Sequence, residues 1–127
     1  MEMLHNAINW FEIPVIDFDR ARKFYSTIYD FEMPERQMGP NKMGFLLFDF
    51  EKQGIGGAIV CGEGYVPVNG GIKIYLNAGS DVNIILDRVE NAGGKILVPK
   101  TAIGENLGFM AMIEDTEGNQ LMLHSVK

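Results

Sequence analysis

The sequence carries an approximate repeat of one short segment in its two halves. Residues 43–49 read MGFLLFD and residues 107–113 read LGFMAMI, about 64 residues further along. A repeat of this kind indicates a supersecondary unit that occurs twice and stacks on its own copy to build a core. Ligand sites commonly form where such units meet, so residues near the junction are the first candidates for function.

Both halves show the same order of predicted elements: strand, helix and three strands. Apolar residues alternate with polar ones in the first strand segment and recur at helical spacing in the two helix segments. The expected strands cover residues 8–15, 32–37, 44–50, 55–60, 72–77, 95–99, 108–114 and 120–125, and the helices cover 19–29 and a segment after Ser80 or Asp81. We predict an α+β fold with one domain over residues 1–127, built from two tandem βαβββ modules whose curved mixed sheets form a cleft. The modules cover about residues 6–61 and 72–127, and a glycine-rich linker of about residues 62–71 joins them.

The first strand has two chemically different faces. Phe11, Ile13 and Val15 alternate with Trp10 and Glu12, so the first three share one face and the last two share the other. The apolar face is expected to pack on the helix that follows. Trp10 and Glu12 are therefore expected to point into the cleft.

Composition excludes several classes of partner. The net charge is −6 and the 11 basic residues form no stripe with aromatics, which argues against nucleic-acid binding. No apolar run reaches membrane-spanning length, so no membrane association is expected. The single cysteine, Cys61, cannot form an internal disulfide, and the N-terminus lacks the layout of a signal peptide. A reducing, cytoplasmic location is the expectation.

Two motifs resemble those of a known family. Residues 17–25, DFDRARKFY, resemble the D-x-x-R-A-x-x-F-Y helix of the vicinal oxygen chelate superfamily, which holds glyoxalase I, extradiol dioxygenases and bleomycin-resistance proteins. Residues 115–119, DTEGN, resemble its D-P-x-G-N turn, with Thr116 in the place of the proline. Residues 10–15, WFEIPV, are similar to the opening of a glyoxalase-like subgroup of unassigned function. The resemblance covers nearly the whole chain and implies the fold predicted above.

The resemblance also implies where a metal would bind. The family's metal enzymes place His, Gln or Glu on the first and last strand of each module. By position, these places fall on Trp10, Lys73, Met122 and either Ala58 or Ile59. Indole, ammonium, thioether and aliphatic groups are unsuited to holding Zn, Ni, Mn or Fe(II) in such a site. We therefore expect no metal and no cofactor, with a divalent metal as the alternative.

The polar candidates lie two residues beyond these positions, and so on the same strand faces. Glu12 follows Trp10, Tyr75 follows Lys73, and His124 follows Met122. All six are expected to line the ligand cleft, with Glu12 and His124 as an acid/base pair. The alternative is that Glu12 caps a strand edge or pairs with Lys73, and that His124 is half exposed without a chemical role.

Three functions are compatible with this pattern. The first is a glyoxalase-like small-molecule-binding protein with a degenerate metal site, for which metal-independent lyase or isomerase activity on a small carbonyl compound is left open. The second is a metal-dependent glyoxalase-type lyase or dioxygenase, and the third is a resistance-type protein that sequesters a drug. A homodimer is expected, because exposed edge strands need cover and many proteins of the family pair, some with a cleft shared between chains.

Overall fold

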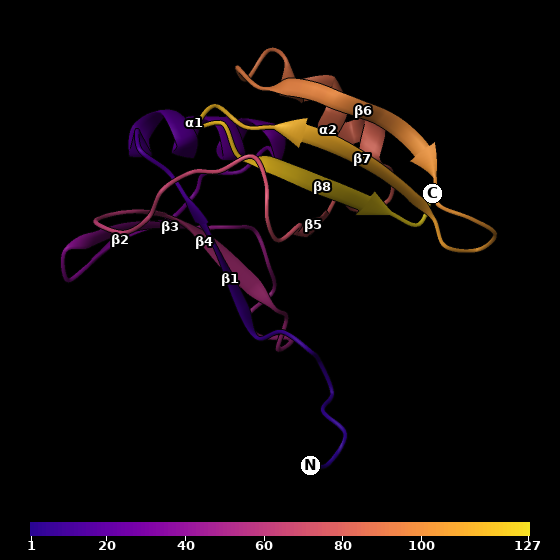
Figure 1. The fold of residues 1–127 in the computed structure, drawn as a ribbon, viewed down its shortest axis with the longest axis horizontal. Coiled ribbons are helices and arrows are strands. Elements are labelled where there is room, and N and C mark those ends of the chain that lie inside the picture. The colour runs from indigo at the N-terminus through magenta and orange to yellow at the C-terminus, as the bar shows by residue number, and fades with distance from the viewer.

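The computed structural model describes residues 1–127 and consists of two βαβββ modules in one chain (Figure 1). This confirms the predicted α+β fold. The first module contains β1 (Trp10–Pro14), α1 (Phe18–Ile28), β2 (Glu35–Met38), β3 (Asn41–Phe45) and β4 (Gly56–Cys61). The second contains β5 (Tyr75–Asn77), α2 (Val82–Val89), β6 (Lys95–Ala102), β7 (Phe109–Glu114) and β8 (Gln120–Ser125).

Each module forms a mixed four-stranded sheet. The strand order is β1-β4-β3-β2 in the first sheet and β5-β8-β7-β6 in the second. The first and last strands of each module run parallel, and the other neighbours are antiparallel. The segment before β1 extends away from the body of the molecule (Figure 1). Neither helix has the length and apolar character that crossing a bilayer requires.

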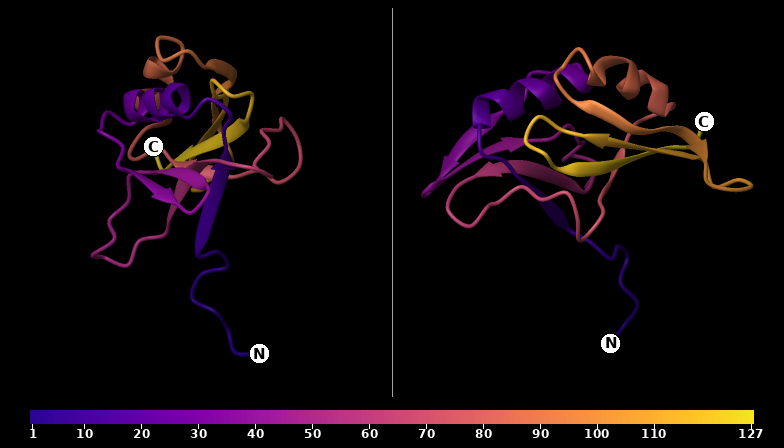
Figure 2. Two further views of the ribbon diagram at one scale, coloured as in Figure 1. Left: turned by 90° about the vertical axis from the view of Figure 1, so that its left-hand side faces the viewer. Right: turned by 45° about the horizontal axis from the view of Figure 1, so that its top comes forward.

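Both helices begin at an aspartate, because a carboxylate can accept the free amides of a first helical turn. Asp17 accepts a hydrogen bond from the amide of Arg20 at 3.1 Å, and Asp81 accepts one from the amide of Asn83 at 2.9 Å. Asp81 is thus the cap of α2, one of the two predicted alternatives. The helices lie together on one side of the molecule, with the strands below them (Figure 2).

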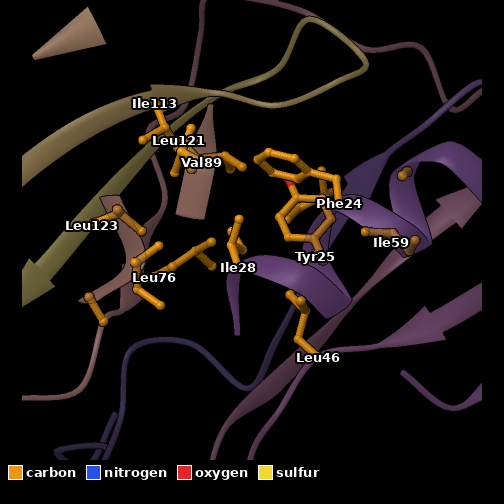
Figure 3. Packing of buried hydrophobic residues seen from close by; sticks show 14 of the residues in the cluster. Phe24, Tyr25, Ile28, Leu46, Ile59, Leu76, Val89, Ile113, Leu121 and Leu123 are labelled. Carbon is orange, nitrogen blue, oxygen red and sulfur yellow. The ribbon is translucent and has the colours of Figure 1, made fainter. Parts of the chain in front are cut away.

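One continuous core joins the two modules. Phe24, Tyr25 and Ile28 of α1 are fully buried and lie close to residues of both sheets, among them Ile59 and Leu123 (Figure 3). The apolar stripe of α2, which includes Val89, completes the same cluster. The faces of the sheets that turn away from this core are called the open faces below.

Strand β1 confirms the predicted alternation of buried and exposed side chains. Ile13 and Val15 are each 1% exposed and belong to the core, whereas Trp10 is 38% exposed and Glu12 is exposed. Because side chains alternate across a strand, Trp10 and Glu12 lie on the open face. The strand itself is shorter than expected.

Backbone hydrogen bonds show which positions of the two modules correspond. The amide of Val15 donates to the carbonyl of Val60, and the amide of Ala78 donates to the carbonyl of His124, each at 2.9 Å. These bonds occur at the same point of each module, just after its first strand. Val15 therefore corresponds to Ala78, and Val60 to His124.

Strand register carries this correspondence along the sheets. Glu12 lies opposite Ala58 in the first sheet, and Tyr75 lies opposite Met122 in the second. Glu12 is thus the counterpart of Tyr75, and Ala58 is the counterpart of Met122. Counting back two residues pairs Trp10 with Lys73, although Lys73 precedes β5 and does not lie in the strand that was predicted over residues 72–77.

Strand register changes the alignment between the two repeated segments, residues 43–49 and 107–113. Phe45 lies opposite Ala58, and Met112 lies opposite Met122, so Phe45 corresponds to Met112 and not to Phe109 as the aligned letters suggest. The reason lies in the turns that lead into the last strands. The loop between β3 and β4 covers residues 46–55, whereas only residues 115–119 separate β7 from β8. The predicted strand over 44–50 accordingly ends early, at Phe45.

The short turn 115–119 ties the second module to the first. The side chain of Glu117 accepts hydrogen bonds from the amides of Ile16 and Asp17, at 3.0 and 2.7 Å. It also forms an ion pair of 2.7 Å with Arg20, and its side chain is completely buried. The side-chain NH₂ group of Asn119 donates a hydrogen bond to the backbone carbonyl of Pro14 at 2.8 Å. The entry to α1 is therefore held by residues about one hundred positions further along the chain.

Candidate ligand-binding site

The positions at which the fold is expected to carry a metal do not offer suitable donors. Trp10, Ala58, Lys73 and Met122 are the four corresponding positions of the two modules, and none carries a carboxylate, imidazole or thiolate. Met122 is buried at 3% exposure, and Ala58 is fully buried. Elsewhere in the chain, no three His, Cys, Asp or Glu side chains lie together in a way that could hold a metal ion. The residues present do not fit a divalent metal.

An aromatic group occupies the open face around Trp10. The indole lies 6.2 Å from the Phe45 ring and 6.0 Å from the Phe48 ring, centroid to centroid, in tilted and edge-on arrangements that are favourable for aromatic pairs. Phe48 covers Gly56, where any side chain would clash with the ring. Glycine at this position therefore makes room for an aromatic surface.

Two apolar cavities adjoin each other at the junction of the modules. The first, called the Lys73 cavity, has a volume of about 350 Å³, and 11 of its 15 lining residues are hydrophobic. The second, called the Glu12 cavity, has a volume of about 410 Å³ and includes Pro14 and Val68 in its wall. Each name gives the single charged residue that lines the cavity. The residues common to both walls are Ile8, Phe11, Ile72 and Ile74.

Glu12 is held by a residue of the linker. The hydroxyl of Tyr65 donates a hydrogen bond of 2.7 Å to the Glu12 carboxylate. This hydrogen bond raises the pKa of Tyr65, with smaller contributions from burial and from the charge of Glu12. Glu12 forms no ion pair with Lys73, so the predicted alternative in which these two residues pair is not realised.

His124 lies in different surroundings. Its Nε2 atom is 2.9 Å from the carbonyl oxygen of Leu107, and it lines a third cavity with Tyr75 and Asn77. Glu12 does not border that cavity. The structure therefore does not bring Glu12 and His124 together as an acid/base pair within one chain, because the two residues belong to different sheets and face different hollows.

The structure distributes the six predicted lining residues over several places. Lys73 and Tyr75 share one cavity, Tyr75 and His124 share another, and Glu12 lines a third. Trp10 does not line the Lys73 cavity, but it packs against Phe48, which does. Met122 is buried in the second sheet.

Sequence reasoning missed Phe48 and Tyr65, and assigned Phe11 to the core alone. Phe11 packs partly on the core and also lines both junction cavities. The glycines at positions 56 and 57 were a usable signal, because adjacent glycines in a strand mark places where large side chains approach the backbone. Tyr65 had no such signal, since it lies in a linker without periodicity.

Comparisons with known proteins agree with this architecture. Residues 7–123 match the model of the Glyoxalase/Bleomycin resistance protein/Dioxygenase superfamily. A glyoxylase-like domain-containing protein of Didymella fabae is 31% identical over 125 residues, which covers 92% of this chain and 91% of that protein.

Solved structures of low sequence identity share the fold. TnmS3, an antibiotic-binding protein from Streptomyces sp. CB03234, is 19% identical, with a TM-score of 0.63 and coverage of 99% of this chain and 100% of that one. The fosfomycin resistance protein FosX from Listeria monocytogenes is 17% identical, with a TM-score of 0.67 and coverage of 98% and 94%. With two βαβββ modules, matched motifs and a family match over nearly its whole length, the chain belongs to the glyoxalase/bleomycin resistance protein/dioxygenase superfamily.

Proposed function

We propose that this protein binds a small, largely apolar organic molecule at the junction of its modules, and that it does so without a metal ion. The observation that carries the proposal is the pair of adjoining cavities with a common wall of Ile8, Phe11, Ile72 and Ile74. Their volumes, about 350 and 410 Å³, fall within the range of roughly 300 to 1,000 Å³ typical of small-molecule sites. Apolar walls favour a ligand that removes apolar surface from water.

The metal-free part of the proposal is supported by side-chain chemistry. Trp10 and Met122 stand where a donor would be needed, and Lys73 would repel a cation. Two proteins of the same fold are described as an antibiotic-binding protein and a fosfomycin resistance protein, so ligand binding is compatible with this architecture. Fold alone does not decide function, and the lining residues carry the proposal.

A ligand screen tests binding directly. We expect small apolar compounds to raise the melting temperature, because a ligand that binds only the folded state stabilises it by mass action. Trp10 is the single tryptophan and contacts Phe48, so its emission should change when the Lys73 cavity fills. Phe48→Ala should raise the Kd about tenfold through lost aromatic contact.

Leu107→Ala is the matched control, because Leu107 is 59% exposed, lies on the loop between β6 and β7 and lines neither junction cavity. Equal losses of affinity in both variants would contradict binding at the module junction.

Metal binding is tested separately by elemental mass spectrometry of protein incubated with Ni, Zn, Mn and Fe(II). We expect no stoichiometric retention after dialysis, and a tightly held equivalent of any of these metals would refute the metal-free proposal.

A second candidate function rests on the contact between Glu12 and Tyr65. A carboxylate and a phenol hydrogen-bonded at 2.7 Å beside an apolar cavity can relay a proton to a bound carbonyl compound, as in a metal-independent isomerase or lyase. Under this proposal, Glu12→Gln would abolish turnover of a bound carbonyl compound while leaving its Kd within about twofold. Turnover that survives the substitution would eliminate Glu12 as the acid/base group.

A further inference from the structure

We infer that the Lys73 cavity selects an organic anion, a molecule with an apolar body and one carboxylate- or sulfonate-type head group. The inference rests on the proposed function and adds the chemical class of the ligand. It comes from the polar side chains of the cavity wall. These are few, and those that are available to a ligand are hydrogen-bond donors.

Lys73 is the only charged residue among those that line this cavity. It has no carboxylate partner, because no ion pair in the protein includes it. Six other basic residues do form ion pairs, and these are Arg20, Arg22, Lys42, Lys52, Lys95 and Lys100. An ammonium group that borders an apolar hollow without a counter-charge favours a negatively charged ligand group.

The neutral polar side chains of the wall also present hydrogen-bond donors. The hydroxyl of Tyr75, which is 55% exposed, has no partner within the protein, so it can donate to a ligand. Asn77 accepts from the amide of Gly79 through Oδ1, which leaves its NH₂ group free to donate. Tyr29 already donates its hydroxyl hydrogen to the carbonyl of Asn77 at 2.8 Å. Three donors, from Lys73, Tyr75 and Asn77, thus face the cavity, and no carboxylate does.

The net charge of −6 opposes an anion at long range, but it does not decide the outcome. At physiological ionic strength, charges more than about 8 Å apart are largely screened from each other. A head group in contact with Lys73 therefore responds mainly to the donors within hydrogen-bond distance. The apolar walls, which include Phe11, Phe48 and Ile74, would cover the body of the molecule.

Three probes of one chain length separate head-group selection from apolar burial: octanoate, octan-1-ol and octylamine. Each is titrated into ¹⁵N-labelled protein, and binding is followed by the amide signals of Gly56, Gly57 and residues 72–77. We expect octanoate to shift these signals with the lowest Kd and octylamine with the highest. Lys73→Gln should raise the octanoate Kd about fivefold, the scale of one partly exposed ion pair.

Lys73→Arg should keep most of the octanoate affinity, because it retains the positive charge. Lys23→Gln, which removes an exposed charge remote from the cavity, should leave the Kd unchanged. Equal Kd values for the three probes, with no effect of Lys73→Gln, would overturn the anion inference and leave small-molecule binding intact. Shifts of these signals by none of the three probes would overturn both proposals.

Discussion

Glu117 is a buried carboxylate that stabilises the fold and lines none of the three cavities described above. Burial alone would raise the pKa of Glu117, but hydrogen bonds from Arg20 and from the amides of Asp17 and Ile16 outweigh it and hold the pKa below the ordinary value. Its side chain is fully buried, whereas 53% of the Arg20 side chain remains exposed. The charged form of Glu117 is therefore a stabilising feature of the native state.

Glu117→Gln should lower the free energy of unfolding by about 2 kcal/mol at neutral pH, the scale of a hydrogen bond to a charged group. The folded-state pKa is depressed, so the contribution is present above the pKa of the unfolded chain and is lost as pH falls through the folded value. Urea unfolding of both proteins between about pH 7 and about pH 3 measures this. The difference should shrink in acid, and a difference that stays constant would contradict the account.

Strand periodicity and the family resemblance predicted which faces carry Trp10, Lys73 and Tyr75. The structure places Lys73 and Tyr75 in the wall of one cavity and Trp10 on the open face beside it. The pairing of Glu12 with His124 could not be judged from sequence, since it depends on how two separate sheets are oriented. Tyr65 was invisible for a similar reason, because its contact with Glu12 depends on the path of an irregular linker.

The linker between β4 and β5 forms part of the wall of the Glu12 cavity. Tyr65 reaches from it to β1, and the amide of Val68 donates to Asn119 at 3.2 Å, so the segment is held at two points. Val68, Gly70 and Gly71 line the Glu12 cavity. Access to that cavity therefore depends on whether the linker stays in place.

Glu12→Gln should lower the pKa of Tyr65 toward its ordinary value, because the carboxylate stabilises the neutral phenol that donates to it and repels the phenolate. NMR titration of the Tyr65 ring measures the pKa directly. The same substitution should modestly speed amide exchange in residues 62–68, since a neutral amide oxygen accepts the Tyr65 hydroxyl less strongly than a carboxylate does. An unchanged Tyr65 titration would mean that the contact does not form in solution.

The helices and strands and their order were predicted from sequence, but the residues at which some of the strands begin and end were not. The α1 cap at Asp17 and the buried helix stripes were predicted from local chemistry and spacing. The strand over residues 44–50 was predicted too long, because its apolar residues continue beyond Phe45 into a loop in which Phe48 lines the Lys73 cavity. The apolar residues of that loop contact the cavity and the junction of the modules. Local periodicity cannot predict such contacts, because they involve residues far away in the sequence.

Over the whole molecule, large apolar side chains remain exposed near the site. Phe50 is 79% exposed, Ile72 is 91% exposed and Leu47 is 60% exposed. Large exposed apolar side chains that form a patch commonly mark an interface. These residues lie on the loop after β3 and the segment before β5, which border the Lys73 cavity.

We expect a homodimer in solution, measured by sedimentation equilibrium. Phe50→Asp should weaken it at least about tenfold, because a charge buried in an apolar contact is unfavourable. Asn83→Asp adds the same charge at an exposed position of α2 and should leave the association unchanged. A protein that sediments as a monomer at all accessible concentrations would contradict the expectation.

The contacts of Glu117 with Ile16, Asp17 and Arg20 also bear on how the chain is made. A ribosome adds roughly 5 to 20 residues per second, so α1 is synthesised seconds before its stabilising carboxylate exists. During that interval, the amides of Ile16 and Asp17 lack their native acceptor. The native entry to α1 can therefore be completed only after the turn that contains Glu117 has been synthesised.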